Sequence, residues 1–436
     1  MSKNKLRPPG KKPELQLHIF SRQYPLLFYI VKWFFITALI GACTGTISAA
    51  FLRSLDWVTT FREAHIWVIT FLPVSGFAIG LLYYYKGKNV EGGNNIVIAT
   101  IDHPHKKIPF RMAPFVYLGT MATHFFGGSA GREGTAIQMS SAIADQFSKP
   151  FKLAKEDRKI LIIAAVAAGF GSVFGTPLAG AVFALEVAIA GRIKYNAILP
   201  AFAAAFTADL VTRLWHTQHT IYHIDIVPPL SVLHLLYAVA AGIFFGLCAA
   251  AFTRGMHGTS ALFRSIIKYP PLRPMVAGII VVLAVWAIGS TKYIGLGIPT
   301  MLQAFNEHLP GYDFLLKIAF TIVTLAAGFK GGEVTPLFFI GAVLGNALSY
   351  FIPLPMGLLA GMGFVAVFAG ATNTPLACAV MAMELFGSQC GVFVAIACIT
   401  AYLFSGDNSI YHAQKRGGKF SRYFLLTSTE TDLKDL

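Results

Sequence analysis

Two glutamates flanked by glycine lie within apolar stretches of this chain. Glu133 lies in the stretch GREGT at residues 131–135, and Glu333 lies in GGEVT at residues 331–335. The start of a helix carries unpaired backbone N–H groups and a partial positive charge, so it attracts an anion. Glycine lets an approaching group come close to the backbone. A carboxylate at such a point occupies the anion site while it is ionised and leaves the site once it is protonated. The first stretch therefore predicts an anion site, its gate and a proton carrier in one place.

Both glutamates also have structural alternatives. Glu133 is compatible with a capping-box acid at a helix start, and Glu333 follows Lys330, with which it could form a plain ion pair. An ionised carboxylate inside a membrane span costs roughly 2.5–3.5 kcal/mol on insertion scales, and such residues usually mark function. We predict that Glu133 is the gate and proton carrier, and that Glu333 is a second protonatable group on the same pathway.

Two further side chains are candidate hydrogen-bond donors to an anion. The loop GGNN at residues 92–95 places Asn94 beside glycine, and an amide offers two N–H donors. Tyr411 follows the last apolar run and offers one O–H donor. The structural alternatives are an ordinary Gly-Asn turn for the loop and a place in the interfacial aromatic belt for the tyrosine.

The composition places these residues in a membrane. The chain has 436 residues, of which 55% are hydrophobic and only 13% charged, whereas about a quarter of the residues of a soluble domain are charged. The apolar runs 162–185, 230–254, 336–383 and 385–405 are each long enough to cross ~30 Å of hydrocarbon. The sequence therefore predicts an all-α polytopic membrane protein surrounded by the lipid bilayer. The five cysteines lie in apolar stretches without a CxxC pair, which favours neither disulfides nor metal ligands.

The net charge of +15 is concentrated at both ends of the chain and in loops. Positive residues favour the cytoplasmic side, so we predict a multi-pass protein of the cell (inner) membrane with both termini cytoplasmic. Nothing else in the sequence supports a nucleic-acid partner. We find no Walker motif, metal-ligand cluster or nucleophile elbow, so the sequence predicts neither an enzyme nor a bound cofactor or metal.

The chain repeats itself at an interval of about 200 residues. Glu333 follows Glu133 by 333 − 133 = 200, and TPLAGAVFALE at 176–186 returns as TPLACAVMAME at 374–384. Such duplication is typical of transporters, in which short, broken helices point at a midplane site. The Thr-Pro pairs are helix-start signatures, and Glu186 and Glu384, ten residues beyond each Thr, are interpreted as mainly structural residues near a membrane surface. The predicted segments are a basic cytoplasmic N-terminal segment (1–23), a first transmembrane repeat (24–215), a linker (216–229), a second transmembrane repeat (230–415) and a cytoplasmic tail (416–436).

The motifs GREGT, GGEVTP, TPLAG and the late IYxxQ together resemble those of the CLC family of anion channels and anion/proton antiporters. The resemblance covers about residues 24–414 and implies two inverted-topology repeats of broken and tilted helices, with a pore in each subunit of a homodimer. It also implies that Glu133 is the gating glutamate, that Tyr411 is the tyrosine near the inner end of the path, and that helix N-termini, including the backbone at Gly134 and Val334, coordinate the anion.

Several positions depart from the usual chloride-handling pattern. Asn94 replaces the anion-coordinating serine, Val334 replaces a phenylalanine and follows the unusual Glu333, and Val187 stands where many proton-coupled members carry an acid. This combination is similar to the CLC branch that exports fluoride in exchange for protons. The resemblance therefore implies a fluoride/proton antiporter, with a chloride/proton antiporter or a passive fluoride or chloride channel of the same fold as alternatives.

Overall fold

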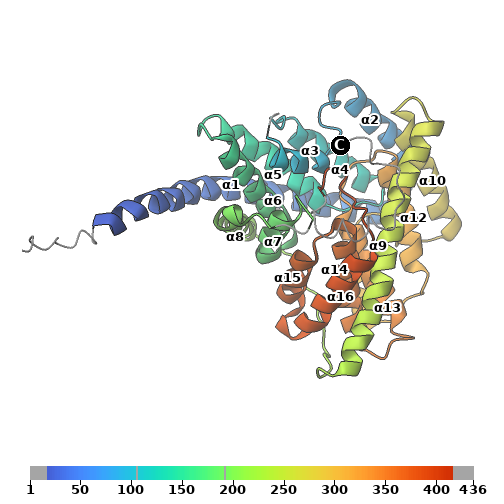
Figure 1. The fold of residues 1–436 in the computed structure, drawn as a ribbon. Coiled ribbons are helices and arrows are strands. Elements are labelled where there is room, and N and C mark those ends of the chain that lie inside the picture. The colour runs from blue at the N-terminus through green and yellow to red at the C-terminus, as the bar shows by residue number, and fades with distance from the viewer. Residues whose placement is uncertain (1–16, 105–106, 191–192, 416–436) are drawn as a thin grey trace, which may run out of the picture.

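The computed structural model describes residues 17–104, 107–190 and 193–415 and is mainly helical there, with a non-helical segment at 217–231. The first half contains eight α-helices: α1 (Leu17–Ala64), α2 (Leu72–Lys86), α3 (Asn94–Asp102), α4 (Met112–Phe125), α5 (Glu133–Ala144), α6 (Lys155–Phe174), α7 (Pro177–Glu186) and α8 (Ile198–Leu214). The second half contains eight more: α9 (Val232–Ile266), α10 (Leu272–Ile288), α11 (Ile298–Asn306), α12 (Asp313–Ala326), α13 (Val334–Leu348), α14 (Met356–Thr372), α15 (Pro375–Phe386) and α16 (Gly391–Phe404). Short 3₁₀ turns occur at Ile66–Phe71, Asp145–Ser148, Tyr195–Ala197 and Ser388–Cys390. Part of α1 extends away from the bundle (Figure 1).

The helix order repeats along the chain. Helices α2 and α10 begin 272 − 72 = 200 residues apart, and α5 and α13 begin 334 − 133 = 201 residues apart. The short helices expected at the motifs are confirmed, because α3 and α11 have nine residues each and α7 has ten. The limits of the two repeats, 24–215 and 230–415, stay a prediction; α1 itself already begins at Leu17.

Two repeat-related helices, α7 and α15, pack against each other in antiparallel fashion and cap each other. Glu384, near the end of α15, accepts hydrogen bonds from the N–H groups of Leu178 (3.1 Å) and Ala179 (2.9 Å) at the start of α7. Glu186, at the end of α7, accepts from Leu376 (3.3 Å) and Ala377 (2.9 Å) at the start of α15. Each carboxylate satisfies orphan N–H groups at the positive end of its partner helix. This reciprocal contact is the geometry expected of inverted repeats.

The same contacts refine the interpretation of the Thr-Pro motifs. Thr176 and Thr374 precede α7 and α15, with proline as the first helical residue, as predicted. Neither threonine side chain makes a capping hydrogen bond. In each case a glutamate of the other repeat accepts hydrogen bonds from the helix start instead. The structural role expected for Glu186 and Glu384 is confirmed. Glu186 is only 5% exposed, so it is enclosed by protein and does not emerge at a surface.

Four helical segments are long and apolar enough to cross a membrane by length and composition: 26–64, 66–86, 195–214 and 232–266. The run 230–254 lies almost wholly within one of them, α9. The other three apolar runs do not form single spans. The run 162–185 is interrupted at Gly175, where the left-handed conformation (φ +78°) ends α6, and the run 336–383 divides into parts of α13, α14 and α15. Breaks of this kind are tolerated at membrane depth where protein encloses the backbone.

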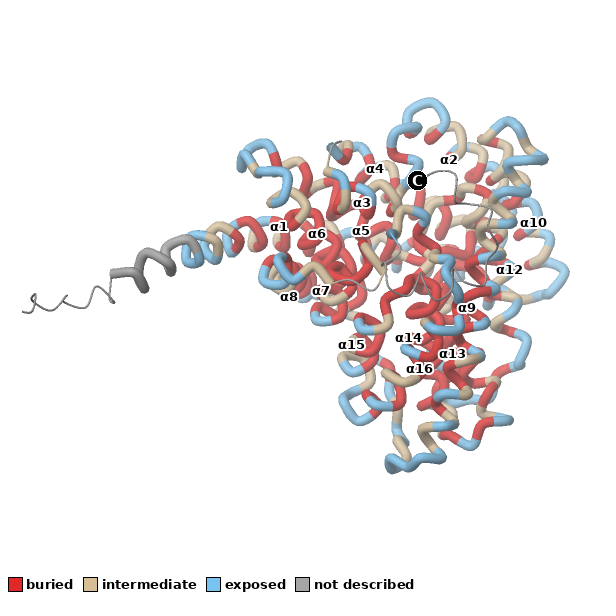
Figure 2. The backbone as a smooth tube through the Cα atoms, in the orientation of Figure 1, coloured by how far each residue is buried: buried red, intermediate tan, exposed pale blue. Residues whose placement is uncertain are grey.

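Helices α6, α13 and α14 form the centre of the bundle and are buried along almost their whole length (Figure 2). Stacked phenylalanines fill the space between them; the rings of Phe338 and Phe364 lie 4.3 Å apart at 10°. Glycine allows α13 and α14 to touch, because a Cβ on Gly341 would overlap the carbonyl oxygen of Gly363. Such close backbone approach is typical of helix packing in membranes, and it fixes the position of the α13 N-terminus.

We expect Gly341→Ala to destabilise the protein by about 3 kcal/mol or more, at the upper end of overpacking effects. Thermal unfolding in detergent measures the change. Gly258→Ala in α9 is the matched control, because a Cβ there meets nothing within 4 Å and a helical Gly→Ala change gains up to about 1 kcal/mol. Equal melting temperatures for the two variants would contradict the packing argument.

Candidate functional site

The two glycine–glutamate motifs meet at the centre of the molecule. Gly131 N–H donates to the Gly332 carbonyl at 2.6 Å, and Gly332 N–H donates to the Gly131 carbonyl at 2.8 Å, so the two stretches form a short antiparallel bridge. Helix α5 begins at Glu133 and α13 begins at Val334, directly after this bridge. The predicted convergence of both helix starts on one place is therefore present.

Glu133 lies in the position expected for an anion. Its side chain is 0% exposed, and its carboxylate accepts hydrogen bonds from Thr335 N–H (3.2 Å) and Thr335 Oγ1 (2.8 and 2.6 Å) at the start of α13. The Arg132 backbone N–H also donates to this carboxylate at 3.2 Å, and the Arg132 guanidinium forms an ion pair with it, with Nε at 3.6 Å. A negative group is favoured at the positive end of a helix, so the carboxylate of the first repeat fills the helix terminus of the second. This is not a capping box, because Glu133 is the first and not the third residue of α5, and its hydroxyl partner lies at the start of α13.

Thr335 is a site residue that sequence reasoning missed. The available signal was that both motifs have threonine two residues after the glutamate, at Thr135 and Thr335. The two threonines serve different ends, because the Thr135 hydroxyl pairs with the Thr120 hydroxyl at 2.7 Å. Only Thr335 contacts the glutamate of the other repeat.

We expect Thr335→Val to release Glu133 from the closed position. Valine keeps the shape of threonine but lacks the hydroxyl that donates to the carboxylate. A hydrogen bond to a charged group contributes about 1.5–3 kcal/mol, so the ratio of closed to open protein falls roughly 10- to 100-fold. The measurement is anion leak from proteoliposomes at fixed pH, with Thr120→Val as control. An unchanged leak would show that the hydroxyl does not hold the gate.

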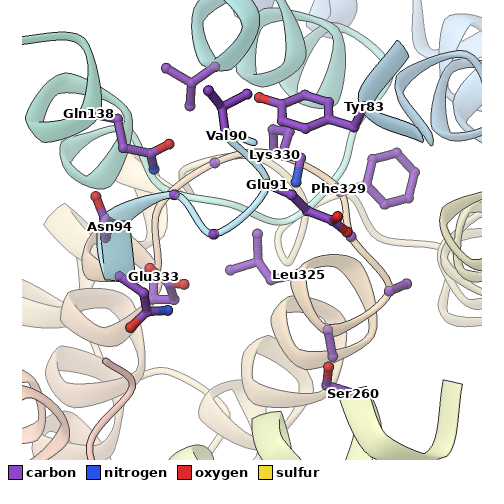
Figure 3. Close-up of a pocket in the computed structure, with 18 of the residues that line it drawn as sticks. Tyr83, Val90, Glu91, Asn94, Gln138, Ser260, Leu325, Phe329, Lys330 and Glu333 are labelled. Carbon is purple, nitrogen blue, oxygen red and sulfur yellow. The ribbon is translucent and has the colours of Figure 1, made fainter. Parts of the chain in front are cut away.

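Three further predicted site residues line one cavity of about 610 Å³ next to Glu133. Asn94, Glu333 and Tyr411 each have a polar atom without a hydrogen-bond partner among the described residues, namely Asn94 Oδ1, Glu333 Oε2 and the Tyr411 hydroxyl. Figure 3 shows the amide and carboxyl groups of Asn94 and Glu333 at the same end of the cavity. Buried polar groups normally have partners, so three such atoms around one space indicate a place for a polar or ionic guest.

Two structural alternatives from the sequence are wrong. Tyr411 is 4% exposed, so it is enclosed within the bundle and does not lie in an interfacial belt. Lys330 makes no ion pair with Glu333; its ammonium lies over the Tyr83 ring, 4.0 Å from the ring centroid. The carboxylate of Glu333 is therefore not neutralised by its sequence neighbour.

Glycine is required at position 134 by the approach of Asn94. A Cβ at Gly134 would lie 2.7 Å from Asn94 Nδ2 and 3.1 Å from Gly332 Cα. Val334 is the first residue of α13 and is fully buried; it does not line the cavity, and its role in binding the anion stays a prediction. Asn94 itself begins α3 after Gly93, whose positive φ of +53° turns the chain into the helix. Three helix starts, those of α3, α5 and α13, thus surround the same place.

Tyr411 is held in position by two residues that the sequence left without a role. Asn95 Oδ1 accepts from Ala413 N–H at 3.0 Å. Gln414 Nε2 donates to the carbonyls of Val187 (3.0 Å) and Thr372 (2.7 Å). These bonds tie the segment after α16 to both repeats. The late IYxxQ motif was the available signal, since it spaces Tyr411 and Gln414 three residues apart.

Within residues 17–104, 107–190 and 193–415, no group of three or more His, Cys, Asp or Glu side chains has the geometry to hold a metal ion. The cavity beside Glu133 is lined instead by donors and by both signs of charge. Its chemistry is that of anion binding combined with proton exchange at carboxyl groups.

Comparison with known proteins agrees with this geometry. A family model described as voltage gated chloride channel matches residues 75–406. A chloride/fluoride channel protein of Pseudomonas syringae pv. tomato is 52% identical over 410 residues, which cover 92% of this chain and 91% of the relative. An H(+)/Cl(−) exchange transporter, ClcA, of Yersinia pestis is 24% identical over 442 residues, covering 93% and 90% of the two chains.

Two solved structures share the fold. The crystal structure of a CLC-type fluoride/proton antiporter matches with a TM-score of 0.87 and 34% identity, covering 89% of this chain and 99% of that one. A slow cyanobacterial Cl−/H+ antiporter matches with a TM-score of 0.76 over 87% of this chain and 96% of that one. At 18% identity, the second match bears on the fold alone.

Proposed function

The chain belongs to the voltage gated chloride channel family, the CLC family, and from this premise we propose that it is a fluoride/proton antiporter that exports fluoride. The observation that carries the proposal is the position of Glu133, whose carboxylate occupies the start of α13 as an anion would. The 34% identity to a CLC-type fluoride/proton antiporter over 89% of this chain supports the choice of ions.

The proposed cycle uses the two glutamates in turn. Ionised Glu133 fills the α13 start and closes the path. A proton that arrives from the Arg132 side neutralises the carboxylate, which removes its attraction to the positive helix end. The neutral side chain leaves, and an anion takes the vacated N–H and hydroxyl donors. The proton passes to Glu333 and from there to the cavity. Glu133, ionised again, returns to the start of α13 and expels the anion away from the cavity, toward the side from which the proton came.

The proposed role of Asn94, Gly134, Val334 and Tyr411 is to hold the anion along this path. Fluoride is smaller than chloride and holds its water more strongly, so hydrogen-bond donors of an amide and a phenol must replace that water. Fluoride is also the conjugate base of a weak acid, so it can share a proton with Glu133 or Glu333. The unpartnered hydroxyl of Tyr411 supports this assignment, and the Asn94 amide offers N–H donors at its Nδ2.

A passive channel is the second candidate. Val187 supports it, because this position carries an acid in many proton-coupled relatives and here has a buried valine. The 52% identical relative is also named a channel protein. Glu333 argues for coupling, since it lies on the cavity side of Glu133 and offers the second carboxyl group that a proton path needs. Chloride in place of fluoride is the remaining alternative of the same fold.

The proposed setting is a lipid bilayer, namely the inner membrane of the cell, with both termini cytoplasmic, and the proposed assembly is a homodimer. The basic ends of the chain support this topology. The cavity lies beside the segment that follows α16, so in this topology it opens to the cytoplasm. The proposal includes no enzymatic step, no cofactor and no nucleic-acid partner.

Fluoride and chloride flux from proteoliposomes, each measured separately with pH followed in the same run, tests the proposal. We expect fluoride efflux with proton movement in the opposite direction and little chloride flux. Fluoride flux that leaves the pH untouched would favour the channel. Equal coupled flux of both anions would favour the chloride-handling alternative.

A further inference from the structure

The cavity beside Asn94 and Glu333 has a second end with a different chemistry. The lining of the whole cavity includes four basic side chains, Lys88, Arg264, Arg273 and Lys330, and two acidic ones, Glu91 and Glu333. Lys88 and Arg264 are exposed and Arg273 is half-buried, so these three form a basic rim. Lys330 is the basic residue that lies next to the site in sequence, three residues before Glu333.

Lys330 is held in a prepared position. The aliphatic part of its side chain lies against α4, where a Cβ on Gly119 would come within 2.9 Å of both Lys330 Cβ and Cγ. Its ammonium lies 4.0 Å from the centroid of the Tyr83 ring, and that ring is fixed in turn by an edge contact with Phe115 at 5.8 Å. A cation over an aromatic face is stabilised without using up its N–H donors.

The ammonium has no hydrogen bond and no ion pair with any residue that the structure describes. Glu91 lies near enough to interact with its charge but does not pair with it. Figure 3 shows Lys330 between the Tyr83 ring and Glu91, with Asn94 and Glu333 at the other end of the cavity. An ammonium has three donors and no acceptor, so this side chain offers donors and a positive charge to the cavity.

We propose that the Lys330 ammonium, fixed by Tyr83 and Gly119, is an anion-binding station in the cavity that takes up a small inorganic anion, fluoride, before it reaches Asn94, Glu333 and Tyr411. This inference rests on the proposed function. The basic rim raises the local concentration of anions, and Lys330 binds one of them at its own end of the cavity. Glu91 limits the affinity by its negative charge, so the anion is released onward.

Equilibrium binding of sodium fluoride to the purified protein, followed by isothermal titration, tests the station. We expect Lys330→Met to raise the dissociation constant about tenfold or more, since a charge and three donors are lost. Lys330→Arg keeps the charge and restores most of the affinity. Glu91→Gln lowers the dissociation constant, because a repelling charge disappears. A purely structural role for Lys330 predicts a lower melting temperature and no opposite shift in the Glu91 variant.

Lys292→Met is the matched control, because Lys292 lines a separate cavity of about 310 Å³; its fluoride affinity should equal that of the unaltered protein. Unchanged affinity in both Lys330→Met and Glu91→Gln overturns the station, and the second variant decides the question if the first fails to fold. Fluoride flux of the unaltered protein is measured in parallel. Its absence overturns the proposed function, whereas the binding shifts judge the station separately.

Discussion

Proteoliposomes that contain Glu133→Gln are expected to move no protons in response to a fluoride gradient. Glutamine keeps the size of the side chain and its acceptor for the Thr335 hydroxyl, at 2.6–2.8 Å in the native contact. It has no ionised form, so it neither responds to the positive end of α13 as a carboxylate does nor carries a proton away. Losing a proton-transfer group reduces rate by about 100-fold or more, and we expect proton flux to fall to the protein-free level.

Glu156→Gln is the control for this substitution, because the Glu156 side chain is 71% exposed and pairs with Lys159 at the surface. It should transport protons and fluoride as the unaltered protein does. Proton flux that persists in Glu133→Gln at the unaltered rate would remove Glu133 from the proton path.

The second large effect is expected for Glu333→Gln, which should stop turnover of both ions. Glu333 lines the cavity and has a carboxylate oxygen, Oε2, without a hydrogen-bond partner among the described residues, whereas Arg132 does not line the cavity. Glutamine there neither accepts the proton from Glu133 nor releases it to the cavity, so the cycle stalls with Glu133 protonated. We expect fluoride and proton flux to fall together by about 100-fold or more.

Glu307→Gln, an exposed glutamate after α11, is the matched control in the second half. The decisive comparison is between the two ions. If Glu333→Gln lost proton flux but kept full fluoride flux, Glu333 would serve only as a proton exit and would not limit the anion cycle.

The positions of Glu133 and Glu333 could be predicted because their signals are local and repeated. A glutamate between glycines in an apolar chain, returning after 200 residues, indicates two helix starts at one site. The repeat alone left open whether its halves are parallel or inverted; the family resemblance implied the inverted relation, and the contact of Glu133 with Thr335 is consistent with it. Tyr411 needed the family resemblance, since its sequence surroundings alone favoured a membrane interface.

The contacts between repeats could not be predicted, because they depend on how distant segments pack. From the sequence alone, Thr335 looks like an ordinary helix residue. Its role becomes visible only when the N-terminal ends of α5 and α13 are placed next to each other. Glu186 and Glu384 have no partner in sequence, yet each caps a helix about 190–206 residues away. An ion pair of Lys330 with Glu333 was a structural alternative in the sequence, but the Lys330 ammonium lies over the Tyr83 ring instead. The breaks at Gly175 and Asn373 could be predicted from the Thr-Pro pairs that follow them, but the left-handed conformation of these two residues could not.

The most direct test of the account uses a proton gradient with equal fluoride on both sides of the vesicle membrane and the membrane potential held at zero. A fluoride/proton antiporter moves protons from the acidic to the alkaline side and therefore drives fluoride toward the acidic side, against its own gradient. Diffusion of undissociated HF through lipid moves fluoride the other way, so protein-free vesicles give the opposite sign. We expect uphill accumulation on the acidic side that disappears in Glu133→Gln. No accumulation there by the unaltered protein would contradict coupled transport and leave a passive channel.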